Sequence, residues 1–306
     1  MKKVILAAAA LAASIGSAFA ADLPSRKAAP VYVPPPPPLW TGFYVGLNAG
    51  GAWSDSNGVN ASAGPVAPGF DWGILSALSG TVANGSTGGF LGGGQVGYNY
   101  QFGSGLGGFG NSWVVGIEAD IQGFAGGGGS NTSSSASIDT INPAFTVIAG
   151  TTISRSLDYL GTVRGRIGLL VTPTLLLYGT GGLAYGGTNL NASAFAAYLP
   201  IAGGPVGAVG FGGASYSDTS VGWTAGGGVE WLFLPNWSAK VEYLYFDLGS
   251  ATLTSVVPTT LTPTGVFAPT LSAGTSYSSR FSGNIVRAGV NYHFNWAAPA
   301  PVAAKF

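Results

Sequence analysis

Apolar and polar residues alternate with a period of two in eight segments between Trp40 and Phe294. Successive side chains of a β-strand point to opposite faces, so each segment predicts a strand with one apolar and one polar face. Residues 113–124 show this most clearly, because Ile117 and Ile121 alternate with Glu118. The eight predicted strands are 40–53, 89–101, 113–124, 159–170, 175–185, 221–233, 237–248 and 284–294.

The connections between these strands alternate between long and short. The long ones follow the odd-numbered strands and are 54–88, 125–158, 186–220 and 249–283. Outer-membrane barrels have short periplasmic turns and long external loops. The pattern therefore predicts an all-β fold, an eight-stranded antiparallel up-and-down transmembrane β-barrel with four long extracellular loops and both termini in the periplasm.

Two stretches inside the predicted loops could form further strands: 145–154 has strand character, and 192–209 is apolar enough to form a further hairpin. We interpret them as extensions beyond the membrane, because eight strands already satisfy the even number that such barrels require. A barrel of ten strands is the alternative.

Composition supports a membrane protein without helical spans. The mean hydropathy is +0.37, yet after residue 20 no apolar stretch approaches the roughly 20 residues that a transmembrane helix needs. A closed barrel is the other structure that satisfies every backbone polar group in lipid. The chain has no Cys, which excludes a disulfide framework, and its formal net charge is zero, so nucleic acid is not an expected partner.

The N-terminus has the three parts of a secretory leader. Lys2 and Lys3 precede an apolar run at 4–13, and small residues at 18 and 20 predict cleavage between Ala20 and Ala21. The predicted organisation is a signal peptide at 1–20, a Pro-rich periplasmic linker at 21–39, the barrel at 40–294 and a C-terminal extension at 295–306. The linker favours extended polyproline II, and a Pro-rich recognition motif is its alternative interpretation.

Charged residues of the predicted strands lie on the polar, inward face. They are Glu118, Asp120, Glu230 and Glu242 with Arg164, Arg166, Lys240 and Arg287. Side chains fill the interior of an eight-stranded barrel, and an unpaired buried charge costs several kcal/mol. We therefore predict that these four acids and four bases pair across the lumen and close it. The alternative is a narrow porin in which Arg164 and Arg166 set the selectivity for small solutes.

His293 is the only histidine and lies on the polar face of the last strand. A catalytic histidine needs a carboxylate and a nucleophile or water beside it, and no such motif is spaced around it, so a lipid-modifying barrel enzyme is the least favoured function. Without Cys and with a single His, the sequence predicts no metal site and no cofactor. Gly103, Gly105 and Gly108 match a dinucleotide-binding pattern, but no helix is predicted after them, so we interpret them as a turn.

Aromatic residues at the strand ends predict two girdles at the membrane interfaces. The periplasmic girdle would contain Trp40, Trp113, Trp231 and Trp237, and the outer girdle Trp53, Tyr159, Tyr185 and Tyr245.

Several motifs carry a resemblance to a known family; they lie at 40–46, 160–168, 234–238, 241–245 and 286–294. With the leader, they resemble the small outer-membrane immunogenic proteins, also called porin-family proteins, of alphaproteobacteria. The resemblance implies a barrel similar to the OmpA membrane domain, with roles in envelope integrity, surface antigenicity and small-solute passage.

A barrel in the Gram-negative outer membrane is expected to contact outer-membrane lipid and lipopolysaccharide and to be inserted by the barrel-assembly machinery. Tyr292 and Phe294 are the predicted assembly signal, with Phe306 as the alternative. The oligomeric state is left open.

Overall fold

The computed structural model describes residues 39–55, 58–65, 75–76, 78–83, 88–102, 112–126, 128–139, 143–204, 208–261 and 271–294. Four predicted segments lie outside these residues: the signal peptide, linker residues 21–38, the Gly-rich turn at 103–108 and the C-terminal segment 295–306. Among the residues that are described, no helix is long and apolar enough to cross a membrane.

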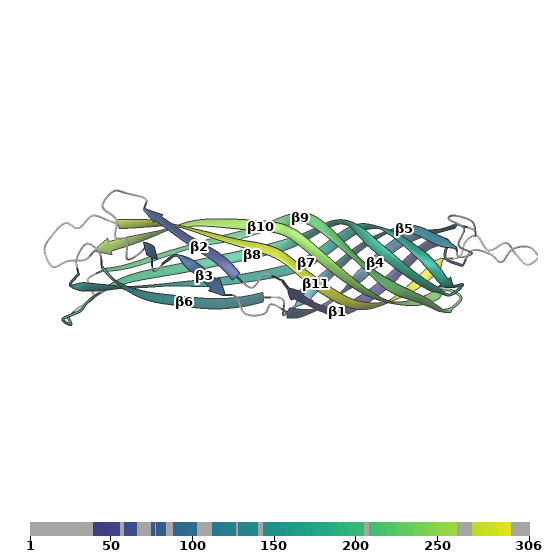
Figure 1. The fold of residues 1–306 in the computed structure, drawn as a ribbon, viewed down its shortest axis with the longest axis horizontal. Helices are drawn as coiled ribbons and strands as arrows, with labels where there is room; N and C mark the ends of the chain where they lie inside the picture. The colour runs from purple at the N-terminus through teal and green to yellow at the C-terminus, as the bar shows by residue number, and fades with distance from the viewer. Residues whose placement is uncertain are drawn as a thin grey trace, which may run out of the picture. The chain divides into compact units, whose positions relative to one another are not determined.

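Strands dominate the described part of the chain, which begins at Leu39 (Figure 1). They are β1 (Gly42–Ser54), β2 (Gly58–Pro65), β3 (Gly80–Ala83), β4 (Gly88–Phe102), β5 (Trp113–Ala125), β6 (Gly128–Ile138), β7 (Phe145–Thr172), β8 (Leu175–Pro200), β9 (Ala208–Leu234), β10 (Trp237–Leu261) and β11 (Leu271–Phe294).

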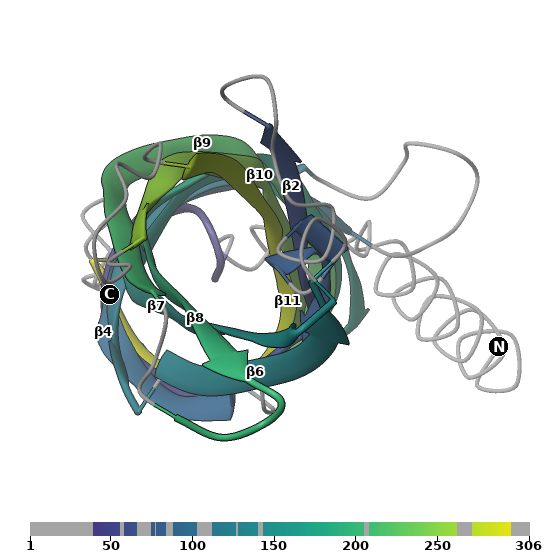
Figure 2. The same cartoon turned by 90° about the vertical axis from the view of Figure 1, so that its left-hand side faces the viewer.

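Eight of these strands form a closed antiparallel ring, seen end-on in Figure 2. The order is β1-β4-β5-β7-β8-β9-β10-β11, and β1 closes the ring by pairing with β11 from Phe43↔Phe294 to Ser54↔Gly283. The eight strands predicted from the sequence are the eight strands of this ring. The ten-strand alternative is wrong for the part of the chain that the structure describes.

Five ring strands, β7 to β11, continue well past the ends of β1, β4 and β5 (Figure 1). We call this continuation the extension. Residues 145–154 are part of β7, and 192–200 are part of β8, so these residues continue ring strands and do not add strands to the ring. Parts of the predicted long loops are therefore strands. Their backbone N–H and C=O groups form hydrogen bonds with the neighbouring strands, as β8 does with β7 and β9.

The three remaining strands take the place of β1, β4 and β5 in the extension. β6 pairs with β7, β2 pairs with β11, and β3 pairs with β2. In the described residues β3 and β6 are not paired with each other, so the sheet of the extension stays open at this seam.

The polarity of the two faces reverses between the ring and the extension. In the ring the outward side chains are apolar, as at Leu47 and Val241, which are 74% and 60% exposed. In the extension apolar side chains such as Val147 and Ile153 are buried inside. On β7 the reversal coincides with a register shift between Leu157 and Leu160, because a one-residue bulge moves every later side chain to the other face.

The outward apolar face on β7 runs from residue 159 to residue 171. This length accommodates the roughly 9–11 residues that a tilted transmembrane strand needs. The apolar outer face of the ring therefore has the height of a bilayer core, and the extension lies beyond it.

Candidate functional site

The lumen of the ring is filled by three layers of side chains. On β7 these layers follow one another as Leu170, then Arg166 and Arg164, then Leu160. The first apolar layer consists of Trp40, Val114, Leu170, Leu176, Tyr178 and Leu232. The second apolar layer lies beside the extension and includes Ala52, Leu91, Leu160, Ala184, Leu244, Phe246 and Ile285. The charged layer lies between them.

The charged layer contains all eight residues that the sequence placed in the lumen. They come from β5, β7, β9, β10 and β11, and none is more than 4% exposed: Glu118, Asp120, Arg164, Arg166, Glu230, Lys240, Glu242 and Arg287. The strands position these eight side chains. Successive side chains of a strand point to opposite faces, so every second side chain is turned into the lumen.

Arg164 lies at the centre of the larger group of charges. Its Nη2 is 2.5 Å from Glu118 Oε1 and 2.8 Å from Asp120 Oδ2, and its Nη1 is 3.1 Å from Glu242 Oε1. Arg287 Nη2 lies 2.8 Å from the same Asp120 oxygen and 2.6 Å from Glu242 Oε2. Each carboxylate is thus shared by more than one cation, which offsets part of the cost of burying it.

Arg166 and Glu230 form a second group on the side of the first apolar layer. Arg166 Nη2 is 2.6 Å from Glu230 Oε2, and the guanidinium carbon lies 4.1 Å from the ring centroid of Tyr178. Tyr44 connects the two groups, because its hydroxyl donates to Glu118 Oε2 over 2.6 Å and accepts from Arg166 Nη1 over 3.0 Å.

Lys240 completes the network, with its Nζ 2.9 Å from Glu118 Oε1. The alternation that turns the charged side chains inward also turns Tyr44 and Tyr178 inward, but sequence reasoning did not assign these two residues to the charged network. A signal for this assignment was available in the sequence. A buried Tyr hydroxyl requires a hydrogen-bond partner, and both tyrosines lie on the same inward face as the charged residues.

His293 is buried at the edge of this layer, near Glu230 and Ser238. Its Nε2 lies 2.9 Å from Ser238 Oγ and 3.5 Å from Glu230 Oε1. The Ser238 hydroxyl donates its single proton to Glu230 Oε1 over 2.6 Å. In a catalytic triad the nucleophile and the carboxylate contact opposite ring nitrogens. Here both face Nε2, so the three residues do not have the geometry of a catalytic triad.

Trp40 is not part of an outward aromatic girdle, and this prediction is wrong. Its side chain is fully buried, and its Nε1 donates to the carbonyl of Pro173 over 3.0 Å. β1 begins only at Gly42, whose φ of 140° suits glycine, so Trp40 precedes the strand alternation and folds into the end of the lumen. Trp53, Trp231 and Trp237 do lie outward, each more than two-fifths exposed.

Tyr292 and Phe294 lie at the end of β11 and are partly exposed on the outward face. Their rings pack edge to face with centroids 5.1 Å apart. Their role as an assembly signal stays a prediction, and the alternative residue Phe306 lies outside the described residues.

The family described as "Outer membrane protein beta-barrel domain" matches residues 5–294. The chain belongs to this outer-membrane β-barrel family. The 31 kDa outer-membrane immunogenic protein of Brucella melitensis is 34% identical over 300 residues, which cover 96% of this chain and all of the relative. The 22 kDa outer membrane protein of Rhizobium leguminosarum is 30% identical over 199 residues, covering 62% of this chain and 71% of that protein.

Among solved structures, OprG of Pseudomonas aeruginosa is similar with a TM-score of 0.35 and 11% identity, covering 83% of this chain and 97% of that one. The family match and the Brucella relative agree with the resemblance drawn from the sequence motifs. The chain is accordingly an outer-membrane β-barrel protein with a buried network of charges in its lumen.

Proposed function

We propose that this protein is a non-enzymatic structural barrel of the outer membrane whose lumen is closed to solutes. The observation that carries the proposal is the layered lumen, in which a fully buried charged layer lies between two apolar layers. A hydrated ion crossing this lumen would have to displace ion pairs between groups such as Arg164 and Glu118 and then pass side chains such as Leu160 and Leu176. Each step carries a desolvation cost.

In this proposal the extension projects from the cell surface, and both termini lie in the periplasm. The long connections and the extension lie at one end of the ring, where outer-membrane barrels place their external loops. Outward residues of the extension such as Ser276 and Ser278 are hydroxylic and therefore suited to water. The name of the Brucella relative adds surface antigenicity to the proposal. Outer-membrane lipid, lipopolysaccharide and the barrel-assembly machinery are the proposed partners.

The absence of enzymatic activity is proposed from the geometry around His293. The nucleophile and carboxylate that a hydrolase would use, Ser238 and Glu230, contact the same ring nitrogen and are sealed from solvent.

Planar-bilayer conductance of the refolded full chain tests the closed lumen. We expect no discrete openings for the unchanged protein. The matched control is Arg280→Gln, which removes the same charge from a side chain that is 60% exposed outside the lumen. Openings that grow when Arg164 and Arg166 are replaced by Gln, and that the control leaves alone, would favour a narrow porin and refute the closed barrel.

A further inference from the structure

The bulge of β7 turns two neighbouring polar side chains to the outside of the barrel. Leu157 and Leu160 both pack in the apolar layer of the lumen that lies beside the extension, and the pairing of β7 with β8 is shifted between them. Asp158 and Tyr159, which lie between the two leucines, therefore both point outward. A regular strand would have turned one of them into the lumen.

The ring of Tyr159 lies across β8 on the outer side of the sheet. A Cβ on Gly187 of β8 would come within 2.6 Å of this ring, so only glycine leaves room for it. The Tyr159 hydroxyl is 2.9 Å from Thr219 Oγ1 on β9. The ring thus reaches from β7 to β9, is held in one position and stays partly exposed.

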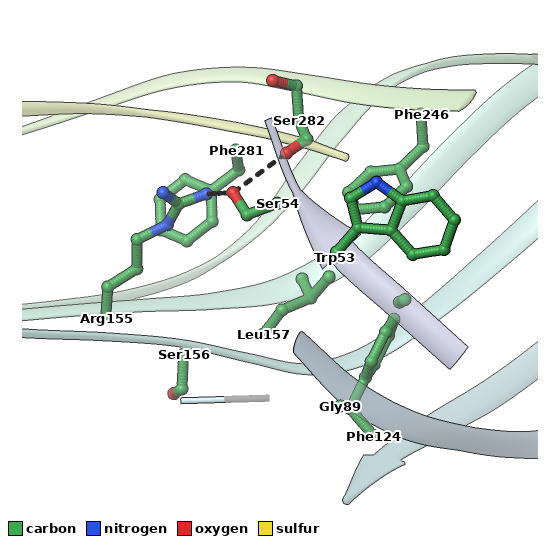
Figure 3. Close-up of a pocket in the computed structure, with 11 residues that line it drawn as sticks. Trp53, Ser54, Gly89, Phe124, Arg155, Ser156, Leu157, Phe246, Phe281 and Ser282 are labelled. Atoms are coloured by element: carbon green, nitrogen blue, oxygen red, sulfur yellow. Dashed lines mark hydrogen bonds between the residues drawn. The ribbon is translucent and has the colours of Figure 1, made fainter. Parts of the chain in front are cut away.

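Polar groups beside this ring hold the exposed carboxylate of Asp158. Asn189 of β8 donates to Asp158 Oδ2 over 2.8 Å, and Ser156 donates to Asp158 Oδ1 over 3.3 Å. Figure 3 shows the Ser156 side chain on the opposite side of β7 from Arg155 and Leu157, which places it on the outer face. A carboxylate accepts about four hydrogen bonds, so both oxygens of Asp158 retain the capacity for a further donor.

An open groove of about 240 Å³ continues from Ser156 along the extension. Its lining includes Ser130 of β6, Ser154 of β7 and Asn191 of β8, which are direct neighbours across the three strands. Gly128 also lines the groove and keeps it wide. A pocket for a drug-sized ligand measures about 300–1,000 Å³, so this groove suits a smaller unit that bonds to hydroxyl and amide groups.

The charges around the ring and the groove disfavour an anionic ligand. Asp158 and Asp218 are exposed on β7 and β9. In the described strands β6 to β9 the cations are Arg155, Arg164 and Arg166, and all three are buried. A phosphate group would meet like charge here, whereas a neutral hydroxyl group can donate to the carboxylates.

We propose that this surface binds a neutral sugar ring of the lipopolysaccharide in the surrounding leaflet. One face of such a ring carries C–H groups, which pack on the electron-rich face of an aromatic ring such as that of Tyr159. The hydroxyl groups of the sugar would donate to Asp158 and accept from the amide of Asn191.

The height of the site in the membrane agrees with this ligand. Tyr159 is the first residue of the outward apolar face of β7, and Tyr is enriched at membrane interfaces. The groove therefore lies just outside the hydrocarbon layer, at the level where the sugars of lipopolysaccharide begin. This step rests on the proposed function, because it uses the orientation of the barrel given there.

Saturation-transfer NMR of the refolded full chain in neutral detergent micelles tests the proposal. The probe is the core oligosaccharide released by mild acid from the lipopolysaccharide of the producing bacterium, without its lipid part. We expect saturable binding, with the strongest transfer to C–H protons on one face of a single sugar. Asp158→Ala should weaken the binding roughly tenfold to a hundredfold, because it removes a charged hydrogen-bond acceptor. Tyr159→Leu should remove the preference for one face of the sugar.

Asp55→Ala is the matched control and should leave the affinity unchanged. Asp55 is also exposed and accepts from an Asn amide, that of Asn284, over 2.8 Å. It follows β1, which lies opposite β8 in the ring. Equal loss in the Asp55 and Asp158 variants, or no saturable binding of the oligosaccharide, would overturn the site.

Two competitors and one further variant test the ligand and the groove. Free maltose that binds as tightly as the oligosaccharide would overturn lipopolysaccharide as the source of the sugar. Inorganic phosphate that displaces the oligosaccharide would overturn a neutral ligand. If Asp158→Ala does not fold, Gly128→Thr narrows the groove, since a Cβ there would meet Ser156 at an ordinary 3.4 Å. An unchanged affinity in that variant would count against the proposal.

The binding experiment is independent of the closed lumen. A conducting barrel would refute the proposed function and leave the NMR result standing, since micelles report binding without transport. Failure to bind the oligosaccharide would overturn the sugar site and leave the closed lumen standing.

Discussion

Arg164→Leu removes the cation at the centre of the charged layer. Arg164 has three carboxylates within 3.1 Å, those of Glu118, Asp120 and Glu242. In the variant Asp120 keeps Arg287 at 2.8 Å, and Glu118 keeps Lys240 at 2.9 Å. The sealed layer nevertheless gains one uncompensated negative charge. Breaking a buried ion pair from one side costs about 3–5 kcal/mol, and we expect the free energy of unfolding to fall by that amount.

Urea unfolding of the refolded protein in micelles, followed by tryptophan fluorescence, measures this loss as a lower midpoint at an unchanged slope. Arg280→Leu is the control, because its guanidinium is 60% exposed although the side chain of its partner Asp247 is only 4% exposed. Its midpoint should therefore fall by less than that of Arg164→Leu. The double variant Arg164→Leu/Asp120→Asn restores the balance of charge. It should lose less than the sum of the two single variants, by about 0.5–3 kcal/mol. A loss below about 1 kcal/mol for Arg164→Leu, or one equal to that of the control, would refute the paired charged layer.

Three further predictions concern the proposed function, assembly and backbone packing. His293→Ala should leave the lipid profile of the envelope unchanged in mass spectrometry, whereas a barrel enzyme that uses this histidine requires a changed profile. Phe294→Ala should reduce heat-modifiable folded protein in outer-membrane fractions, while deletion of 295–306 should not; the opposite result would move the assembly signal into the tail. Gly222→Ala should destabilise the barrel in urea by about 1–3 kcal/mol, because a Cβ there would overlap the backbone of β10. Gly51→Ala meets nothing within 4 Å and should behave like the unchanged protein.

The predicted faces of the ring strands agree with the structure because alternation is a local property. Ile117 and Glu118 are neighbours in the chain, and a strand turns them to opposite sides whatever the rest of the fold does. Trp40 was assigned to the wrong face because it lies before the strand begins, where alternation no longer applies.

The extension was only partly predictable for a related reason. Residues 145–154 have strand character, but β7 reverses its inward face at the shift between Leu157 and Leu160. A pattern with one fixed parity does not continue across such a bulge. The apolar interior of the extension therefore emerged only once the register of β7 against β8 was known.

The sequence by itself determined that this is an eight-stranded outer-membrane barrel and which charged residues face its lumen. Both conclusions depend on strand periodicity and on the spacing of turns, which neighbouring residues encode. Only the tertiary structure decided which charges meet, such as Arg287 and Asp120, which are 167 positions apart in the chain. It also decided that apolar layers enclose the charges. Those contacts depend on how the strands are staggered when the ring closes, and stagger is a property of the whole barrel rather than of any one strand.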